Sequence, residues 1–202
     1  MTQNNISNGM NHTFNPNVFF DLSSFEHKDL FQVENVWEVL SKISSFIKNK
    51  SSQSITLGEG TVIEEGALIK GPVIIGKNCF IAHGAYIREN VILGDNVHIG
   101  HSVELKNSIV LSKTHIAHFN YVGDSIIGRD VNFSAGAITA NFRLDGATIK
   151  IKNEGEEIET GLTKLGTIIG DKSRIGVNSV LNPGTILSKN SKVFPLTNVF
   201  GV

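Results

Sequence analysis

Two cations stand at a spacing that would let them act together. Arg88 and Lys106 are 18 residues apart, and each directly follows an aliphatic residue of a repeating pattern. In a chain that coils with an 18-residue period, their side chains would lie one above the other, separated by the ~4.8 Å between neighbouring strands. Two cations at that distance can bind one phosphate. Most exposed cations are only solvated, but these two occupy positions where many repeats carry glycine, which favours a binding site.

Histidines form a second group in the same region. Five of them lie close together in the sequence: His83, His98, His101, His115 and His118. Three histidines at a subunit junction can bind zinc, as in the hexapeptide-repeat carbonic anhydrases. The second paired histidine of that family is missing here, because Gly123 occupies the position five residues after His118. We therefore expect no metal site and interpret His83 and His101 as surface or interface residues.

The stretch that begins at His118 is polar where the rest of the pattern is apolar. It reads HFNYVGDSIIGRDVNFSAGAITANF and contains Tyr121, Asn132 and Asn141. A neutral imidazole can remove a proton from an attacking amine or hydroxyl. Asparagine side chains and backbone amides can hold a sugar or stabilise a developing oxyanion. This combination indicates acid–base chemistry on a sugar-like substrate, with His118 as the base.

These residues must be positioned by a repeat of six residues. Ten aliphatic residues follow one another at this spacing: Leu57, Ile63, Ile69, Ile75, Ile81, Ile87, Leu93, Ile99, Leu105 and Leu111. A period of six fits neither an α-helix nor an alternating strand, and it is typical of a solenoid with one short strand and one corner per repeat. Three such repeats form one triangular coil. The sequence therefore predicts an all-β fold, a parallel β-helix of six to seven coils.

The repeat is interrupted twice. Its phase slips near residue 117 and resumes with four residues: Tyr121, Ile127, Phe133 and Thr139. Residues 143–166 then leave the pattern, which returns with five further residues: Ile169, Ile175, Leu181, Leu187 and Val193. We interpret residues 143–166 as an excursion from the solenoid, in the form of a loop or hairpin, because such insertions often carry function.

The N-terminal quarter of the chain differs in composition. Residues 1–18 are rich in asparagine and poor in aliphatics, which predicts a flexible tail. Within residues 19–50, four aliphatic residues form a stripe at helical spacing: Val36, Leu40, Ile43 and Ile47. We expect this helical segment to cover an end of the solenoid or to pack on a neighbouring subunit. Residues 51–202 are expected to form the solenoid itself.

Composition limits the classes of function. The 202 residues carry a formal net charge of −1, so the chain offers no basic field for nucleic acid or acidic membranes. The single cysteine, Cys79, excludes an internal disulfide and is expected to be a buried thiol. The N-terminal residues lack the basic start and the apolar stretch expected of a signal peptide, and no run approaches the ~18 apolar residues that a membrane span needs. We expect a cytoplasmic protein that binds neither nucleic acid nor membranes.

Residues from about 20 to 195 resemble a known family. The similarity rests on the segments NFRLDG and GLTKLGTIIGD and on the order of six residues: Arg88, Lys106, His118, Tyr121, Asn132 and Asn141. These features are similar to the acetyltransferase domain of the bifunctional N-acetylglucosamine-1-phosphate uridyltransferase/glucosamine-1-phosphate acetyltransferases. They are still more similar to the C-terminal domain of related bacterial and archaeal sugar-1-phosphate nucleotidylyltransferases.

The resemblance implies a left-handed β-helix that forms a homotrimer, with active sites between neighbouring subunits. The implied reaction moves the acetyl group of acetyl-CoA to the amine of a hexosamine-1-phosphate. In this family the residue matching His118 is the general base, and the residue matching Asn141 lies beside the acetyl group. Family positions for the sugar phosphate or nucleotide-sugar match Arg88, Lys106, Tyr121, Asn132 and Lys164. Family positions near acetyl-CoA match Ala135, Phe142 and Val177.

Departures from the family keep an alternative open. The Gly-rich loop of the nucleotidylyltransferase domain is absent from the sequence, so we expect no nucleotidyl transfer. Phe142 stands where the bifunctional enzymes have tyrosine, and Val177 replaces a serine that contacts acetyl-CoA. The alternative is a non-catalytic trimeric module that binds a sugar nucleotide or acts as a scaffold for a separate nucleotidylyltransferase. A zinc hydratase is a more distant alternative.

Overall fold

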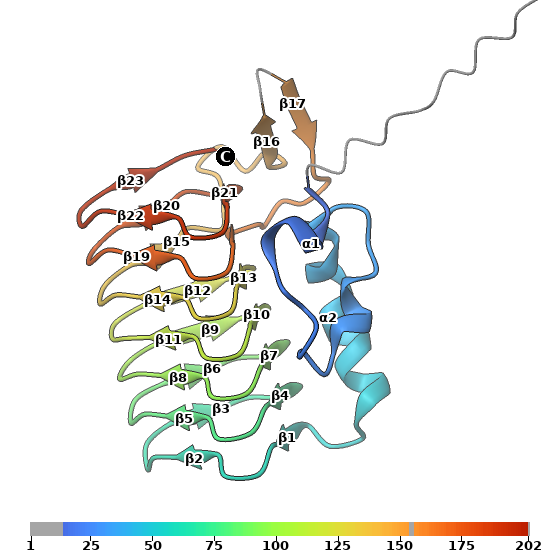
Figure 1. Ribbon diagram of the computed structural model, residues 1–202, viewed down its shortest axis with the longest axis vertical. Coiled ribbons are helices and arrows are strands. Elements are labelled where there is room, and N and C mark those ends of the chain that lie inside the picture. Colours follow the sequence, from blue (N-terminus) through green and yellow to red (C-terminus); the bar gives the residue numbers. More distant parts are fainter. Residues whose placement is uncertain (1–13, 154–155, 202) are drawn as a thin grey trace, which may run out of the picture.

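A computed structural model describes residues 14–153 and 156–201, and its main feature is a three-sided parallel β-solenoid (Figure 1). Every side of the solenoid is a sheet of seven strands, and each coil adds one strand to each sheet. The prediction of a parallel β-helix with six to seven coils is confirmed.

The strands of the three sheets alternate along the chain. Sheet A consists of β1 (Ile55–Leu57), β4 (Val73–Ile75), β7 (Val91–Leu93), β10 (Ser108–Val110), β13 (Ile126–Ile127), β18 (Thr167–Ile169) and β21 (Thr185–Leu187). Sheet B consists of β2 (Val62–Ile63), β5 (Phe80–Ile81), β8 (His98–Ile99), β11 (His115–Ile116), β14 (Asn132–Phe133), β19 (Arg174–Ile175) and β22 (Lys192–Val193). Sheet C consists of β3 (Leu68–Ile69), β6 (Tyr86–Ile87), β9 (Glu104–Lys106), β12 (Tyr121–Gly123), β15 (Ile138–Thr139), β20 (Val180–Leu181) and β23 (Asn198–Val199).

Aliphatic side chains from all three sheets fill the interior of the solenoid. Ile75 pairs with Leu93 in sheet A, and Ile87 pairs with Leu105 in sheet C. All four are buried, and full burial of one such side chain contributes about 1.5–3 kcal/mol to folding. The predicted distance of 18 residues between stacked positions is confirmed for these coils.

Two steps of the ladder contain five residues instead of six, which corrects the predicted register. Val110, not Leu111, pairs with Leu93 and enters the interior. Leu111 instead joins the apolar cluster outside sheet A. Val122, not Tyr121, pairs with Leu105. The predicted slip near residue 117 is therefore wrong.

Both short steps fall where the chain turns from sheet C to sheet A. The first runs from Leu105 to Val110, and the second from Val122 to Ile127. Both corners have lost one residue, yet an aliphatic residue still follows at the six-residue position after Leu105. The sequence count therefore passes the first short corner without a visible break and shows a slip only near residue 117.

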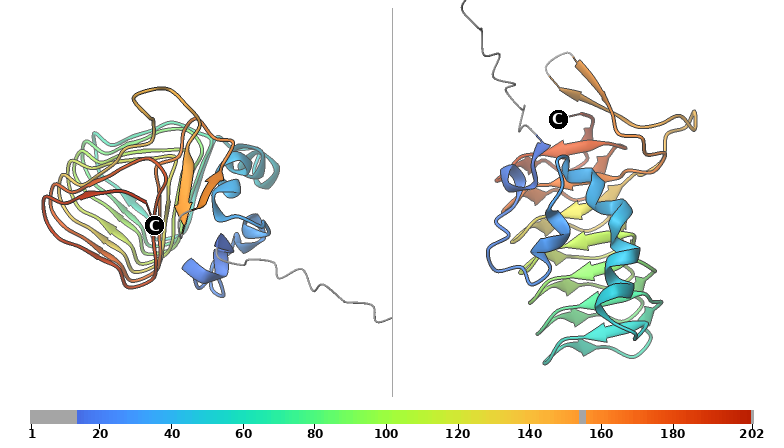
Figure 2. Two further views of the ribbon diagram at one scale, coloured as in Figure 1. Left: turned by 90° about the horizontal axis from the view of Figure 1, so that it is seen from above. Right: turned by 90° about the vertical axis from the view of Figure 1, so that its right-hand side faces the viewer.

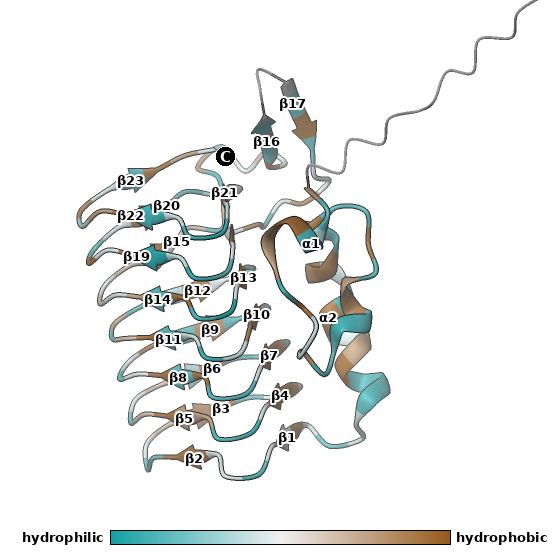
Figure 3. Cartoon of the chain, viewed as in Figure 1, coloured by the Kyte–Doolittle hydropathy of each residue, from teal (hydrophilic) through white to brown (hydrophobic). Residues whose placement is uncertain are grey.

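The N-terminal segment lies along the outer face of sheet A (Figures 1 and 2). Its helices are α1 (Pro16–Phe19), η2 (Lys28–Phe31), η3 (Val36–Glu38) and α2 (Val39–Lys50). The four residues of the predicted stripe are all buried: Val36, Leu40, Ile43 and Ile47. Figure 3 shows the apolar residues of this segment together with those of the strands that it covers.

The expectation that this segment covers an end of the solenoid is wrong. Sheet A turns a column of isoleucines outward, and these pack against the segment: Ile74, Ile92, Ile109, Ile126, Ile168 and Ile186. An exposed apolar column of this length needs a cover, because water cannot hydrogen-bond to it. The middle residue of each three-residue strand in sheet A points outward, away from the interior of the solenoid. These outward residues form the apolar surface against which the helical stripe packs.

Ordered structure begins before the predicted end of the N-terminal tail. Phe14 is buried, and its ring lies 5.2 Å from that of Trp37, measured between centroids. Asn15 caps α1 by accepting a hydrogen bond from the amide of Asn17. Residues 14–18 are therefore part of the fold, while residues 1–13 lie outside the described residues.

The excursion contains a hairpin, as the sequence suggested. Strand β16 (Lys150–Asn153) pairs in antiparallel fashion with β17 (Glu156–Glu159). Ile149 and Ile151 are buried and extend the cluster between sheet A and the N-terminal segment. A Cβ atom at Gly184 would lie 2.7 Å from Cγ2 of Ile149, so this glycine lets the hairpin pack closely on the last coils.

Cys79 lies inside the solenoid, as expected for a structural thiol. Its Sγ donates a hydrogen bond to the carbonyl oxygen of Gly94 at 3.1 Å. Burial raises the pKa of the Cys79 thiol, which keeps it protonated and unreactive. In the part of the chain that the structure covers, no helix is both long and apolar enough to cross a bilayer.

Replacing Ile92 with alanine is expected to destabilise the protein by about 2–4 kcal/mol, because this buried side chain joins sheet A to the N-terminal segment. Leu144, whose side chain is fully exposed, provides the control. Leu144→Ala should change the free energy of unfolding by less than about 0.5 kcal/mol. Urea unfolding followed by circular dichroism measures both, and equal effects would contradict the packing described here.

Candidate functional site

Several predicted substrate residues gather around Asp124. This carboxylate lies at a corner between sheets C and A and is only 3% exposed. It accepts hydrogen bonds from Asn107 Nδ2 at 2.9 Å and from Asn141 Nδ2 at 2.5 Å. The Nζ atom of Lys106 lies 3.3 Å from its Oδ2 atom. Donors from the coils on either side therefore share one buried carboxylate.

The shortened corners explain why these side chains converge. Asn107 and Asp124 have φ angles of 45° and 48°, in the left-handed region that asparagine and aspartate tolerate better than most residues. A Cβ atom at Gly123 would overlap the hydroxyl of Tyr121 and the amide of Asn141. Glycine at this position leaves the space in which those two side chains meet.

Tyr121 and Arg88 extend the network on the face of sheet C. The hydroxyl oxygen of Tyr121 accepts a hydrogen bond from Asn141 Nδ2 at 3.1 Å. Burial raises the pKa of Tyr121, so at neutral pH the hydroxyl keeps a proton that it can donate to a ligand. Arg88 forms ion pairs with Glu104 at 3.0 Å and with Glu89 at 3.7 Å.

The predicted pair of cations is stacked as expected, but each cation already forms an ion pair with a carboxylate. Ile87 pairs with Leu105, so Arg88 and Lys106 follow residues that lie one above the other. Both cations have a carboxylate partner within 3.3 Å. A phosphate that binds here must therefore compete with a carboxylate at each of them.

Lys164 is connected to this network through the backbone. It is exposed and forms an isolated antiparallel bridge with Phe142. The amide of Leu165 donates a hydrogen bond to the carbonyl oxygen of Asn141 at 3.1 Å. The end of the excursion thus returns to its beginning. The structure gathers five predicted substrate or catalytic residues in this region: Arg88, Lys106, Tyr121, Asn141 and Lys164.

His118 lies at the opposite edge of sheet C, where the chain turns from sheet B to sheet C. It is exposed, and its carbonyl oxygen accepts a hydrogen bond from the amide of Gly136 at 2.8 Å. Ala135 and Val177 occupy the equivalent corner of the next two coils, where the amide of Asn178 donates to the carbonyl oxygen of Ala135 at 3.0 Å. The predicted base and two predicted acetyl-CoA positions therefore share one corner.

Asn132 belongs to neither corner. It is exposed on sheet B, where its strand neighbours are His115 and Arg174. Within one chain, the structure consequently separates the predicted residues into the network around Asp124, the corner at His118, and Asn132.

Histidines also stack on the outside of sheet B. The rings of His98 and His115 lie 4.1 Å apart and are almost parallel, at 6°. Burial, with smaller effects of neighbouring histidines, lowers the pKa of both, so both are mainly neutral at pH 7. At the nearby corner, Nδ1 of His101 lies 2.8 Å from the carbonyl oxygen of His83. Among residues 14–153 and 156–201, no group of three or more potential ligands is arranged to hold a metal ion.

The sequence analysis missed Asp124 and Asn107, the two residues that connect the network. Asp124 stands 18 residues after Lys106, but the shortened corner makes Gly123 the strand partner of Lys106, so the ion pair with Asp124 is diagonal. The 18-residue rule, applied to carboxylates, would have named this pair, although the true register at this corner is 17 residues. No comparable signal identifies Asn107, because its side chain reaches Asp124 only through the shortened corner.

Comparison with known proteins identifies relatives of this chain. The model of the GMPPB C-terminal domain matches residues 69–160, and that of the hexapeptide repeat of succinyl-transferase matches residues 166–193. The bifunctional protein GlmU of Methanococcus maripaludis is 46% identical over 170 residues, which are 78% of this chain and 41% of that protein. The bifunctional sugar-1-phosphate nucleotidylyltransferase/acetyltransferase of Sulfurisphaera tokodaii is 41% identical over 80 residues, 40% of this chain and 20% of that protein.

Two further matches, one in sequence and one in structure, extend the comparison. The uncharacterized acetyltransferase YaiX of Escherichia coli is 36% identical over 149 residues, 74% of this chain and 65% of that protein. The crystal structure of a hexapeptide transferase family protein from Anaplasma phagocytophilum aligns with a TM-score of 0.52 at 16% identity, over 73% of this chain and 79% of that one.

The chain spans no more than 41% of the length of the first two curated relatives that it matches. The matches nevertheless cover most of the solenoid, from β3 to β22. The chain is a hexapeptide-repeat protein homologous to the C-terminal region of the bifunctional GlmU proteins.

Proposed function

We propose that the protein is an acetyltransferase that moves the acetyl group of acetyl-CoA to the amine of a hexosamine-1-phosphate. The observation that carries this proposal is the polar network of Lys106, Asp124 and Asn141, which is organised by a buried carboxylate. A relative named as a bifunctional sugar-1-phosphate nucleotidylyltransferase/acetyltransferase supports both the sugar phosphate and the acetyl donor.

The phosphate of the substrate would bind to Arg88 and Lys106. The side chain of Arg88 is 33% exposed, and its partner Glu104 is 36% exposed. Ion pairs at such positions contribute only about 0–1 kcal/mol, so a phosphate dianion can displace the carboxylate and bind the guanidinium through two hydrogen bonds. Asp124 would hold the more buried Lys106 in position, and the exposed Lys164 would approach from the excursion.

The chemical step needs a base and an electrophile in contact. The amine nitrogen attacks the thioester carbon, a C–N bond forms, and the tetrahedral intermediate collapses with cleavage of the C–S bond. His118 would accept the proton that the amine loses, and the thiolate of CoA would leave and be protonated. The thioester would lie along the corner formed by His118, Ala135 and Val177, while Asn141 and Phe142 of the other corner face the acetyl group and the cofactor.

We further propose a homotrimer with sites between subunits. His118 and Asp124 are at opposite edges of sheet C, and six residues of extended chain span about 20 Å. One substrate cannot bridge this distance within one chain, but a second copy could bring its Asp124 network to the His118 corner of the first. Sheet A is covered by the N-terminal segment, so sheets B and C remain for subunit contacts, with Asn132 on sheet B.

A non-catalytic trimeric module that binds a sugar nucleotide is the second candidate. Val177 favours it, because this residue is 43% exposed on the corner proposed for the thioester and provides no hydroxyl for acetyl-CoA. The phosphate clamp would serve such a module equally well.

His118→Ala is expected to lower kcat by a factor of roughly 10²–10⁴, because the proton of the attacking amine loses its acceptor. The measurement is CoA release with acetyl-CoA and glucosamine-1-phosphate. Since His118 is exposed, the variant should keep its oligomeric state in light scattering. Undiminished turnover would exclude His118 as the base.

Calorimetry with acetyl-CoA separates the two candidate functions. The acetyltransferase must bind acetyl-CoA at millimolar concentration or below, whereas the non-catalytic module need not. Absence of any binding isotherm, together with binding of a sugar nucleotide, would replace the first proposal by the second.

Asp124→Asn is expected to destabilise the protein by about 1–3 kcal/mol, because it leaves the ammonium of Lys106 without its charged partner in a poorly hydrated corner. Asp145→Asn is the control, since Asp145 and Arg143 form an exposed ion pair that should contribute less than about 1 kcal/mol. Urea unfolding of both variants measures the difference. Equal stabilities would mean that Asp124 does not organise the corner.

A further inference from the structure

A second group of cations lies at the corner between sheets A and B. Four of them line a cavity of about 370 Å³ beside the N-terminal segment: Lys113, Arg129, Lys172 and Lys189. They follow four successive strands of sheet A, namely β10, β13, β18 and β21. This corner is separate from the Asp124 network, which lies between sheets C and A.

The stacking of coils brings the four cations within reach of one ligand. Neighbouring coils are joined at this corner by backbone hydrogen bonds, such as that from the amide of Lys172 to the carbonyl oxygen of Arg129 at 2.8 Å. At ~4.8 Å per coil, the cations occupy a strip about 14 Å long. A diphosphate, with oxygens on both phosphorus atoms, can contact several of them at once.

Two of these lysines stand at backbone positions to which lysine is poorly suited. Lys113 and Lys172 have φ angles of 65° and 62°. The same corner position in other coils is occupied by residues that adopt this left-handed conformation more readily: Gly60, Asn78, Asn96, Asp130 and Asn190. The backbone therefore does not account for lysine at these two positions, which points to a role for the charge.

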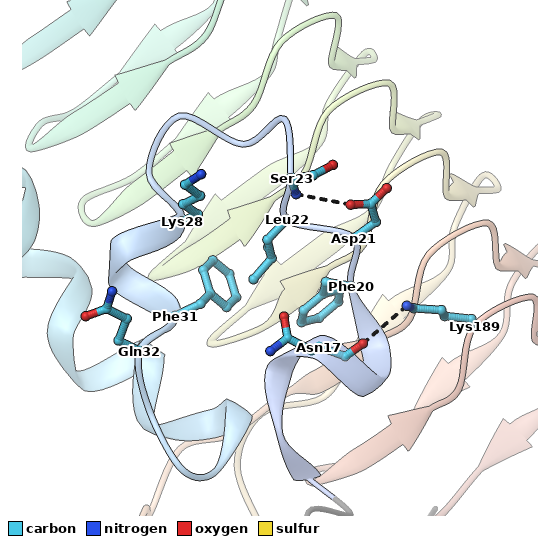
Figure 4. A pocket seen from close by; sticks show the side chains of 9 residues that line it. All are labelled: Asn17, Phe20, Asp21, Leu22, Ser23, Lys28, Phe31, Gln32 and Lys189. Atoms are coloured by element: carbon cyan, nitrogen blue, oxygen red, sulfur yellow. Dashed lines mark hydrogen bonds between the residues drawn. The ribbon is translucent and has the colours of Figure 1, made fainter.

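The carboxylates that line the cavity are already engaged elsewhere. Asp171 accepts hydrogen bonds from the backbone amides of Arg129 at 2.7 Å and Asp21 at 2.6 Å. Asp130 forms an ion pair with Arg174 at 3.3 Å. Asp21 accepts a hydrogen bond from the amide of Ser23 at 3.1 Å (Figure 4).

The cations form no close ion pair with these carboxylates. Local hydrogen bonds lower the pKa of Asp21, and the charges of Arg129 and Lys189 lower it further. Between residues 14–153 and 156–201, none of the four forms an ion pair within 4.0 Å. Among the described residues, the guanidinium of Arg129 donates only to the hydroxyl of Ser24 at 3.4 Å. The ammonium of Lys189 donates only to the carbonyl oxygen of Asn17 at 3.3 Å (Figure 4). The four cations outnumber the three carboxylates of the lining, so repulsion between cations on neighbouring coils is only partly offset, and an anion in the cavity would reduce it further.

We infer that this corner binds the phosphate groups of a small anionic ligand, such as a diphosphate or a phosphorylated metabolite. A second cavity of about 670 Å³ adjoins it and shares Asp21 and Lys189 (Figure 4). Phe20 and Phe31 line this second cavity together with Asn17, so it offers space for the organic part of such a ligand. The inference does not depend on the proposed acetyltransferase activity.

Calorimetric titration of the full chain with sodium pyrophosphate at constant ionic strength tests this site. The double variant Lys113→Gln/Lys172→Gln removes two cations whose side chains are exposed, and it should weaken binding at least tenfold. The control Lys48→Gln/Lys77→Gln changes the net charge equally and places one substitution at the same type of corner, outside the cavity. It should bind pyrophosphate with the affinity of the unaltered protein.

A third variant, Arg88→Gln/Lys106→Gln, distinguishes this site from the proposed substrate clamp. Retention of one binding site in this variant supports the inference. Three results would overturn the inference. The first is loss of pyrophosphate binding in the Arg88→Gln/Lys106→Gln variant, and the second is an equal affinity of the Lys113→Gln/Lys172→Gln variant and the unaltered protein. The third is no binding to the unaltered protein at millimolar pyrophosphate. Parallel titrations with glucose-1-phosphate and uridine diphosphate identify the source of the phosphate, and dependence on Lys113 and Lys172 is required for either.

Discussion

The whole molecule depends on the pairing of very short parallel strands from one coil to the next. The strands of the three sheets contain only two or three residues, far too few to be stable alone. Each gains stability because its backbone hydrogen-bonds to the coil below while its inward side chain packs on the corresponding side chain. The interior must therefore remain aliphatic at almost every inward position, which leaves little room there for polar chemistry.

This constraint moves the polar groups to the outer surface, and above all to the corners, where the backbone adopts left-handed conformations. The Asp124 network, His118 and the cations around Lys113 each occupy a different corner. Stacking fixes the distances within a corner, since every position recurs at the separation of neighbouring strands. Between corners the distance is set by the width of a sheet, so groups on different corners meet only through a large ligand or a second subunit.

Local periodicity explains which parts of the fold could be predicted. The six-residue repeat indicated the parallel β-helix, and its threefold multiple placed Arg88 above Lys106. The same count failed at Leu111 and Tyr121, because a corner can lose one residue while an aliphatic or aromatic residue still stands at the expected position. The stripe of the N-terminal helix was recognised correctly, but its partner was not, since the outward isoleucines of sheet A looked like part of continuous apolar strands.

By itself, the sequence determined the solenoid, most of its inward residues and the stacking of residues 18 apart in the coils with full-length corners, because these follow from a spacing that those coils repeat. Only the tertiary structure decided that the N-terminal segment covers sheet A, that the shortened corners join Asn107, Asp124 and Asn141, and that Arg88 and Lys106 each have a carboxylate partner. It also separated His118 from these residues. Contacts of this kind depend on the exact length of a corner and on which element covers which face of the solenoid. Neither property produces a periodic pattern in the sequence.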